Sequence, residues 1–147
     1  MYDVLIIGAG KSFALCPPAS LTSFTGPAGL SSALALARVR CTSAIFDSGL
    51  YRNAKARYSH NYLSRDHVPP SELLNVSKAQ LKEPKYHKLI HFAPLPAVHA
   101  SKIEKGFEVK DQDGKVWQGK KLILAVGCKD IMSEIPGEVF FMSVDSG

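Results

Sequence analysis

Several features that would assign a chain to a particular class of protein are missing from this sequence. Its three cysteines, Cys16, Cys41 and Cys128, lie too far apart to form a Cys-x-x-Cys pair. No apolar run approaches the length of a membrane span, and the short apolar start carries Asp3 instead of the basic segment of a secretory signal. We therefore expect a cytoplasmic protein, not bound to a membrane, with free thiols.

The charged residues indicate no particular partner either. The chain has 147 residues, with 18 Lys and Arg, 13 Asp and Glu and a formal net charge of +5. The basic residues are scattered, which argues against nucleic-acid binding. His87 and His91 are four positions apart, but their segment resembles a strand and offers no acidic or thiol partner, so we predict no metal site.

What the sequence does contain is an apolar run that ends on glycine. Residues 4–7 are all apolar and are followed by Gly8-Ala9-Gly10, which is typical of a buried parallel strand leading into a dinucleotide-binding Gly-x-Gly-x-x-Gly turn. Residues 11–25, rich in Ser, Thr and Pro, then separate Gly10 from Pro27-Ala28-Gly29. A P-loop ending at residues 10–12 is excluded, because Leu5 stands where that motif requires glycine.

Removing residues 11–26 restores the turn as Gly8-Ala9-Gly10-Pro27-Ala28-Gly29. Asp47 lies 37 positions after Gly10, and the removal reduces this spacing to 21. The dinucleotide fold places the acid that binds ribose hydroxyls roughly 20 residues on. We hypothesise that residues 11–26 are a retained, in-frame intron, since codons for residues 10–12 and 25–26 can contain splice sites. A tolerated surface insertion is the alternative.

The remaining pattern predicts alternating strands and helices. Helices are expected at 27–38 and from an N-cap at Ser71 to about residue 82. Strands are expected at 42–46, 87–92 and 121–126, with an antiparallel meander at 98–103, 106–110 and 115–118. This order indicates an α/β, three-layer, Rossmann-like FAD/NAD(P)-binding domain with a parallel sheet and a small β-meander, in incomplete form.

Four further stretches carry a specific resemblance. They are residues 46–53 (Phe-Asp-Ser-Gly-Leu-Tyr-Arg-Asn), 60–63 (His-Asn-Tyr-Leu), 122–130 (Leu-Ile-Leu-Ala-Val-Gly-Cys-Lys-Asp) and 135–137 (Ile-Pro-Gly). Together with the glycine motif they resemble the thioredoxin-reductase-like, FAD-dependent pyridine nucleotide-disulphide oxidoreductases, and most of all the fungal dithiol oxidases of the gliotoxin type. The resemblance covers residues 1–137 except the insertion, and residues 138–147 form a divergent tail.

This resemblance implies an FAD site. The glycine loop and the following helix would hold the pyrophosphate, Asp47 would bind the adenosine ribose, and the backbone of Val98 would contact adenine. His60 would line the cofactor and Asn61 would approach the flavin. Val126 replaces a threonine that is usual in the family. The implied cofactor-binding residues are Gly8, Ala9, Gly10, Pro27, Ala28, Gly29, Asp47, Ser48, Gly49, Leu50, Tyr51, Arg52, His60, Asn61, Val98, Ala125 and Gly127.

The resemblance also implies parts that this sequence does not carry. The family's redox Cys-x-x-Cys follows the Ile-Pro-Gly segment, and no such pair follows Gly137 here. The NADPH-type domain is absent as well. We therefore expect an inactive N-terminal fragment of a homodimeric enzyme that acts on small-molecule or protein dithiols and disulphides, in secondary metabolism. The choice between oxidase and NADPH-dependent reductase stays open. The alternatives are a stand-alone nucleotide-binding module and the first domain of a flavin monooxygenase.

Overall fold

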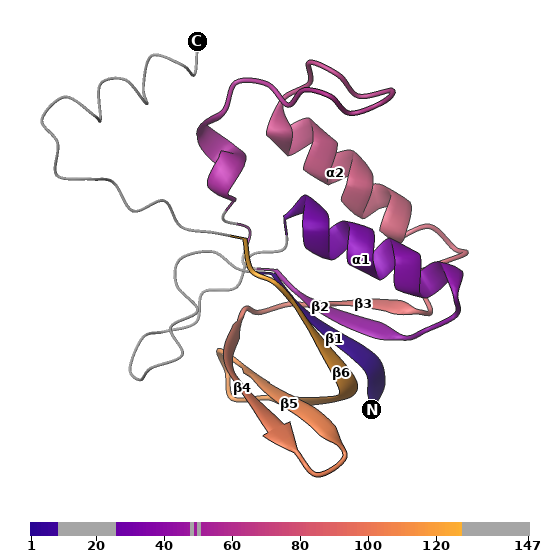
Figure 1. Cartoon of the computed structure of the whole chain (residues 1–147), viewed down its shortest axis with the longest axis vertical. Helices are drawn as coiled ribbons and strands as arrows, with labels where there is room; N and C mark the ends of the chain where they lie inside the picture. Colours follow the sequence, from indigo (N-terminus) through magenta and orange to yellow (C-terminus); the bar gives the residue numbers. More distant parts are fainter. Residues whose placement is uncertain (9–25, 48, 50, 128–147) are drawn as a thin grey trace, which may run out of the picture.

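The computed structural model describes residues 1–8, 26–47, 49 and 51–127. The elements follow one another as β1 (Tyr2–Gly8), α1 (Pro27–Arg38), β2 (Ser43–Phe46), the 3-10 helix η1 (Arg52–Lys55), α2 (Pro70–Leu81), β3 (Ile90–Ala93), β4 (Ala97–Ile103), β5 (Gly106–Asp111) and β6 (Val116–Ala125). The predicted α/β fold, with a parallel sheet and an antiparallel meander, is confirmed (Figure 1). No helix within the described ranges is long and apolar enough to cross a membrane.

One six-stranded sheet runs through the molecule in the order β3-β2-β1-β6-β5-β4. The strands β3, β2, β1 and β6 are parallel, whereas β5 and β4 join the sheet in antiparallel pairing. In the parallel part, Gly8 pairs with Ala125, Ile7 with Phe46, and Phe46 with Ala93. The carboxyl ends of four strands therefore meet at one edge of the sheet.

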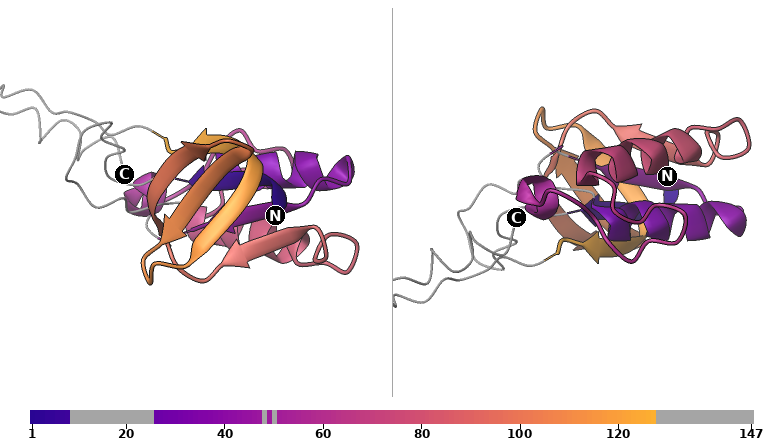
Figure 2. Two further views of the ribbon diagram at one scale, coloured as in Figure 1. Left: turned by 90° about the horizontal axis from the view of Figure 1, so that it is seen from below. Right: turned by 90° about the horizontal axis from the view of Figure 1, so that it is seen from above.

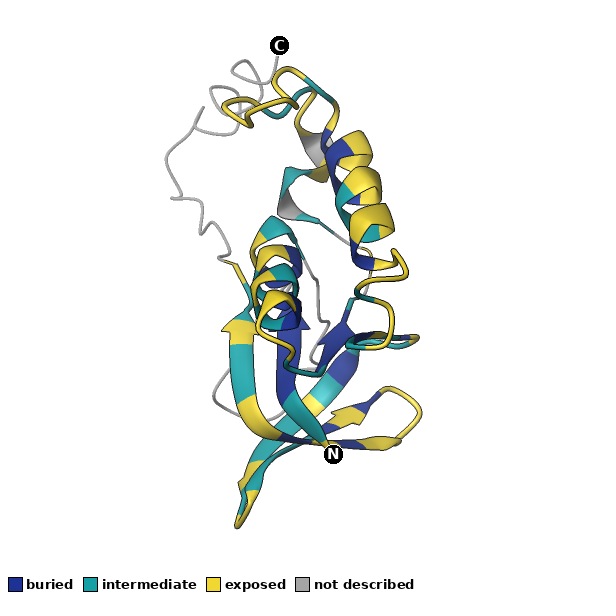
Figure 3. Cartoon of the chain, turned by 90° about the vertical axis from the view of Figure 1, so that its right-hand side faces the viewer, coloured by how far each residue is buried: buried dark blue, intermediate teal, exposed yellow. Residues whose placement is uncertain are grey.

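The two helices cover one face of the parallel strands (Figures 1 and 2). Because side chains alternate along a strand, Val4 and Ile6 of β1 point to this face. They pack with the small, buried side of α1, which includes Leu30 and Ala33, and with Leu74 of α2. Figure 3 shows the burial concentrated on the inward sides of the helices and on the central strands.

The meander covers the opposite face, which gives the third layer. Leu5 and Ile7 of β1 and Phe46 of β2 point to this side and pack with Val109 and Trp117 of the meander. The continuous apolar run of β1 is explained by this arrangement, since a strand covered on both faces has no polar side.

The structure corrects the prediction of two separate strands at 115–118 and 121–126. These segments form one strand, β6, whose first half pairs antiparallel with β5 and whose second half pairs parallel with β1. Gly119 lies where the two pairings meet, opposite both Tyr2 and Phe107. A Cβ atom on Gly119 would lie 2.6 Å from Cγ of Leu5. Glycine here therefore marks a close approach within a strand, not a break between strands.

Two predicted boundaries also shift. The helix α2 begins at Pro70, and proline is favoured at the first helical position. Its N-cap is Pro69, which makes no side-chain capping hydrogen bond, so the prediction of Ser71 as N-cap is wrong. The third strand starts at Ile90, three residues later than predicted. The reason is a run of turns before it, in which the carbonyl of Tyr86 accepts hydrogen bonds from the backbone N–H groups of Leu89 and Ile90.

Candidate nucleotide-binding site

The carboxyl edge of the parallel strands is the candidate site. In open α/β sheets, ligands bind outside this edge. Gly8 ends β1, Asp47 directly follows β2, and Ala125 ends β6. The helix α1 begins on the same side, because it returns antiparallel to β1 over the helical face of the sheet (Figure 1).

The first turn of α1 suits an anionic group. Gly26 is its N-cap in an extended conformation, and the carbonyl of Gly26 accepts hydrogen bonds from the N–H groups of Gly29 and Leu30 at 3.1 and 3.3 Å. Pro27 stands at the first helical position, and no acidic residue lies in the first turn. Among the described residues of the helix, no acid in that turn offsets the positive end of the helix dipole, which favours a phosphate there.

Asp47 is held in place by the short turn that follows it. The backbone N–H of Gly49 donates to Oδ1 of Asp47 at 3.0 Å, and the Tyr51 hydroxyl donates to Oδ2 at 3.0 Å. Gly49 has φ +76°, which glycine adopts without steric cost. The turn therefore fixes the carboxylate at the end of β2.

Lys78 of α2, which the sequence analysis missed, also contacts Asp47 and Tyr51. Asp47, Gly49, Tyr51 and Lys78 together form the Asp47 cluster. Nζ of Lys78 lies 2.5 Å from Oδ2 of Asp47 and donates to the Tyr51 hydroxyl at 2.6 Å. The side chains of Asp47 and Lys78 are only 10% and 26% exposed. Burial alone would lower the pKa of Lys78, but the hydrogen bonds to Asp47 and Tyr51 outweigh it and raise that pKa. Burial also raises the pKa of the Tyr51 hydroxyl.

The backbone around Val98 is irregular in a way that bears on its predicted role. The pairing of β4 with β5 shifts register between Ala97 and His99, so Val98 lies at a β-bulge on the outermost strand of the sheet. A bulged residue on an edge strand presents backbone groups that the ladder does not use. On β6, Ala125 pairs with Gly8, and Gly127 is exposed with φ +64°.

His60 and Asn61 lie instead on the exposed loop between η1 and α2. The backbone N–H of Asn61 donates to Oδ1 of Asp66 at 2.8 Å, and Nδ1 of His60 lies 3.9 Å from the same oxygen. The ring of His60 lies 5.0 Å from that of His67, centroid to centroid. The structure thus assigns these two residues to a local loop cluster. Their predicted contact with a cofactor stays a prediction.

The remaining predicted site residues lie on α1, on η1 or outside the described residues. Of α1, Ala28 is exposed and Gly29 is buried. Ala9, Gly10, Ser48 and Leu50 lie outside the described residues, as do Cys16, Cys128 and the whole of residues 128–147. The side chain of Arg52 is likewise not described.

Neither histidine of the 87/91 pair has the surroundings of a metal ligand. Nδ1 of His87 lies 2.8 Å from the carbonyl oxygen of Pro84, while the His91 ring lies 5.3 Å from that of Trp117. Within the described ranges, no cluster of three or more His, Cys, Asp or Glu residues could hold a metal ion.

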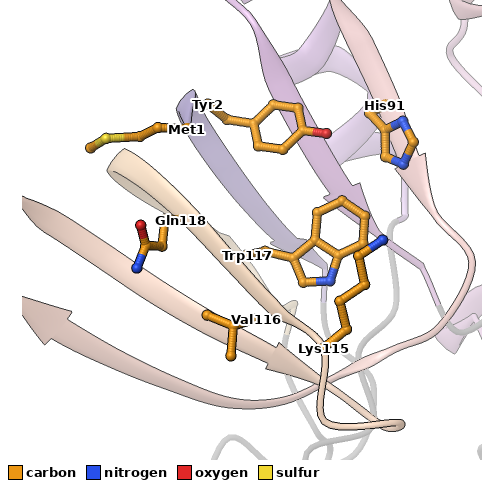
Figure 4. Close-up of a pocket in the computed structure, with 7 residues that line it drawn as sticks. All are labelled: Met1, Tyr2, His91, Lys115, Val116, Trp117 and Gln118. Atoms are coloured by element: carbon orange, nitrogen blue, oxygen red, sulfur yellow. The ribbon is translucent and has the colours of Figure 1, made fainter.

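A hollow lies at the opposite, amino edge of the sheet (Figure 4). The rings of Tyr2, His91 and Trp117 line it, and Nζ of Lys115 lies 4.2 Å from the centroid of the Trp117 ring. Its full lining is Met1, Tyr2, His91, Lys115, Val116, Trp117 and Gln118. No carboxylate is among these residues, whereas Asp47 supplies one at the carboxyl edge.

Comparisons with known proteins point to the same family as the sequence motifs. No family model matches the chain. Thioredoxin reductase sirT of Leptosphaeria maculans is 40% identical over 139 residues, which cover 93% of this chain and 37% of that protein. Thioredoxin reductase tcpT of Claviceps purpurea is 42% identical over 113 residues, which cover 76% of this chain and 35% of that protein.

A solved oxidoreductase from Agrobacterium tumefaciens superimposes with a TM-score of 0.73 at 31% identity, covering 92% of this chain and 40% of that one. The chain therefore spans less than half the length of the relatives it matches. In sequence and in fold, it is related to the thioredoxin-reductase-like oxidoreductases.

Proposed function

We propose that the chain is the FAD-binding part of an oxidoreductase of the thioredoxin reductase or dithiol oxidase type. The observation that carries this proposal is the placement of both Asp47 and the first turn of α1 at the carboxyl edge of β1, β2 and β6. The Asp47 carboxylate can accept hydrogen bonds from ribose hydroxyls, and the N-terminal turn of α1 attracts a phosphate. The relationship to thioredoxin reductases supports FAD as the nucleotide.

Different groups among the described residues suit different parts of FAD. The backbone N–H groups at the start of α1 would hold the pyrophosphate, and the Asp47 carboxylate would accept hydrogen bonds from the adenosine ribose. Backbone groups of Val98, exposed by the bulge, would meet the adenine edge. Ala125 and Gly127 would lie beside the cofactor where β6 ends. The bound flavin would supply the redox chemistry, namely electron exchange with a dithiol or disulphide.

We further propose that this chain does not by itself catalyse dithiol oxidation or disulphide reduction. Such chemistry requires two thiols next to each other and beside the flavin. Cys41 is a half-buried free thiol on the turn between α1 and β2, and none of the three cysteines is spaced to pair with another in a Cys-x-x-Cys motif. The dithiol or disulphide substrate, NADPH use and dimerisation would then belong to the full-length protein.

The proposal extends to residues 11–26, which separate the two halves of the glycine turn. The N-cap of α1 is a glycine, Gly26, and removal of residues 11–26 would place Gly10 directly before Pro27 in the same role. The restored turn would then connect β1 to α1 without an intervening segment, as tight phosphate-binding turns require. Sequencing the transcript across codons 10–27 tests the intron hypothesis, and a spliced message that still encodes residues 11–25 would refute it.

Cofactor binding is tested by expressing the chain both as it stands and without residues 11–26. We expect the shortened protein to bind FAD, measured as flavin absorbance of the purified protein and as quenching of flavin fluorescence on titration. The chain as it stands should bind FAD less tightly. A matched control is Asp47→Ala in the shortened protein, which should lose affinity. A folded, monodisperse shortened protein that binds ADP but not FAD would favour a stand-alone nucleotide-binding module instead.

A further inference from the structure

Among the described residues that contact Asp47, Lys78 is one that the family resemblance does not account for. We propose that Lys78 is a positioning residue of the nucleotide site. It holds the Asp47 carboxylate ionised and oriented, and thereby makes binding depend on the hydroxyl groups of the adenosine ribose. This inference rests on the proposed function, because it concerns the same nucleotide site.

The first argument is the geometry of the carboxylate. Oδ2 of Asp47 contacts both Nζ of Lys78 and the hydroxyl of Tyr51, while Oδ1 accepts the N–H of Gly49. These contacts fix the rotation of the carboxylate from both sides. Each carboxylate oxygen can accept more than one hydrogen bond, so a carboxylate that already has donors within the protein can also accept a ribose hydroxyl. A carboxylate fixed in this way is preorganised for the ligand, which lowers the entropy cost of binding.

The second argument is burial. The Asp47 side chain is only 10% exposed, and an ionised carboxylate that has lost this much water is costly unless a charge compensates it. Tyr51 is neutral and supplies a hydrogen bond but no charge. Among the described contacts of Asp47, the ammonium group of Lys78 supplies the opposite charge. The raised pKa of Lys78 means that this group is protonated at neutral pH.

The third argument is the way α2 presents the lysine. Lys78 lies one turn after Leu74 and one turn before Leu81, both of which are buried in the core beneath the helix. Its ammonium group also lies 5.2 Å from the centroid of the Tyr51 ring. Packing of α2 against the sheet and α1 therefore brings the charge to the end of β2. A surface lysine has no such constraint.

The test compares two ligands that differ only in the ribose hydroxyls, ADP and 2′,3′-dideoxyADP. Calorimetric titration is carried out on the full chain and, in parallel, on the protein without residues 11–26. Lys78→Met should weaken ADP binding by about tenfold and leave the affinity for 2′,3′-dideoxyADP unchanged within about twofold. Lys78→Arg, which keeps the charge, should restore most of the ADP affinity.

Lys82→Met is the matched control. Lys82 follows the last residue of the same helix and is exposed, and its Nζ lies 5.6 Å from the centroid of the Phe92 ring. This variant should bind both ligands like the unaltered protein. Should Lys78→Met fail to fold, Lys78→Gln makes the same comparison, since it keeps a hydrogen-bond donor and removes only the charge.

Two results would overturn the inference in different ways. If Lys78→Met or Lys78→Gln weakens both ligands equally, or neither, then Lys78 has a structural role only and the proposed function stands. If the unaltered protein binds ADP and 2′,3′-dideoxyADP with equal affinity, Asp47 does not bind the ribose hydroxyls and the inference fails. If neither the full chain nor the protein without residues 11–26 binds ADP, 2′,3′-dideoxyADP or FAD, the proposed function fails. The inference then fails with it.

Discussion

The indole Nε1 of Trp117 donates a hydrogen bond to Oδ2 of Asp111 at 2.9 Å, and both side chains are buried. The other carboxylate oxygen, Oδ1, accepts the backbone N–H groups of Asp113 and Lys115 at 3.2 and 2.9 Å. The rings of Trp117 and Phe46 lie nearly perpendicular to each other, with their centroids 5.5 Å apart. One carboxylate therefore closes the turn between β5 and β6 and orients the largest ring of the meander layer.

We predict that Asp111→Asn lowers the free energy of unfolding by about 1–3 kcal/mol. The carboxylate accepts three hydrogen bonds, and the NH₂ group of asparagine would face at least one of the donors. Urea unfolding followed by the fluorescence of Trp117, the single tryptophan of the sequence, measures the change. The control is Asp113→Asn on the exposed tip of the same turn, for which we expect a change below about 0.5 kcal/mol. Equal losses in the two variants would contradict this role of Asp111.

Gly119 provides a second prediction, from the close approach of β6 to β1. Gly119→Ala would place a Cβ atom 2.6 Å from Cγ of Leu5, which is fully buried and has little room to move. We expect a loss of roughly 1–3 kcal/mol in the free energy of unfolding, as for other overpacked cores. In a Leu5→Ala background the same substitution should cost much less, because the clashing atoms are gone. A cost that is the same in both backgrounds would show that the strain lies elsewhere.

The order of elements could be predicted because it depends on local patterns. The apolar run of β1, the proline at the start of α1 and the alternation in the meander are all set by near neighbours. The prediction of a break at residues 119–120 failed for the opposite reason. Gly119 is required by the side chain of Leu5, which is distant in sequence but adjacent in the sheet.

The candidate site shows the same division. Asp47 could be found from its spacing to the glycine motif, since the βαβ unit fixes that spacing. Lys78 could not, because a lysine on a helix usually faces water. The buried neighbours at positions i−4 and i+3, Leu74 and Leu81, were the available signal that position 78 lies beside the inward side of α2.

Asp3 makes the stability of the fold depend on pH at acid values. Hydrogen bonds from Lys120, and from the backbone N–H and hydroxyl of Thr42, hold the pKa of Asp3 well below its ordinary value of 3.8. Because the folded pKa is the lower one, the contribution to stability is complete above the unfolded pKa. It is then lost as the pH falls from about 3.8 through the folded value.

We therefore predict that Asp3→Asn is less stable than the unaltered protein at neutral pH and that the difference shrinks as the pH falls below about 4. Melting temperatures measured from about pH 7 to pH 2 test this. Glu104→Gln, in the exposed turn between β4 and β5, serves as the control and should melt in parallel with the unaltered protein. A constant difference between Asp3→Asn and the unaltered protein at all pH values would mean that the contacts of Asp3 act without its charge.

The pair of Asp47 and Lys78 allows stability and ligand binding to be separated in one set of variants. Asp47→Asn leaves the half-buried ammonium of Lys78 without the carboxylate charge of Asp47. We expect a loss of roughly 1–3 kcal/mol in the free energy of unfolding, because removing one partner of a largely buried ion pair costs more than removing both partners. Adding Lys78→Met should therefore recover part of that stability. It should not recover affinity for ADP, since the double variant still lacks the carboxylate that accepts the ribose hydroxyls. Urea unfolding and calorimetric titration of the single and double variants measure the two effects, and a double variant that regains ADP binding would place the ribose away from Asp47.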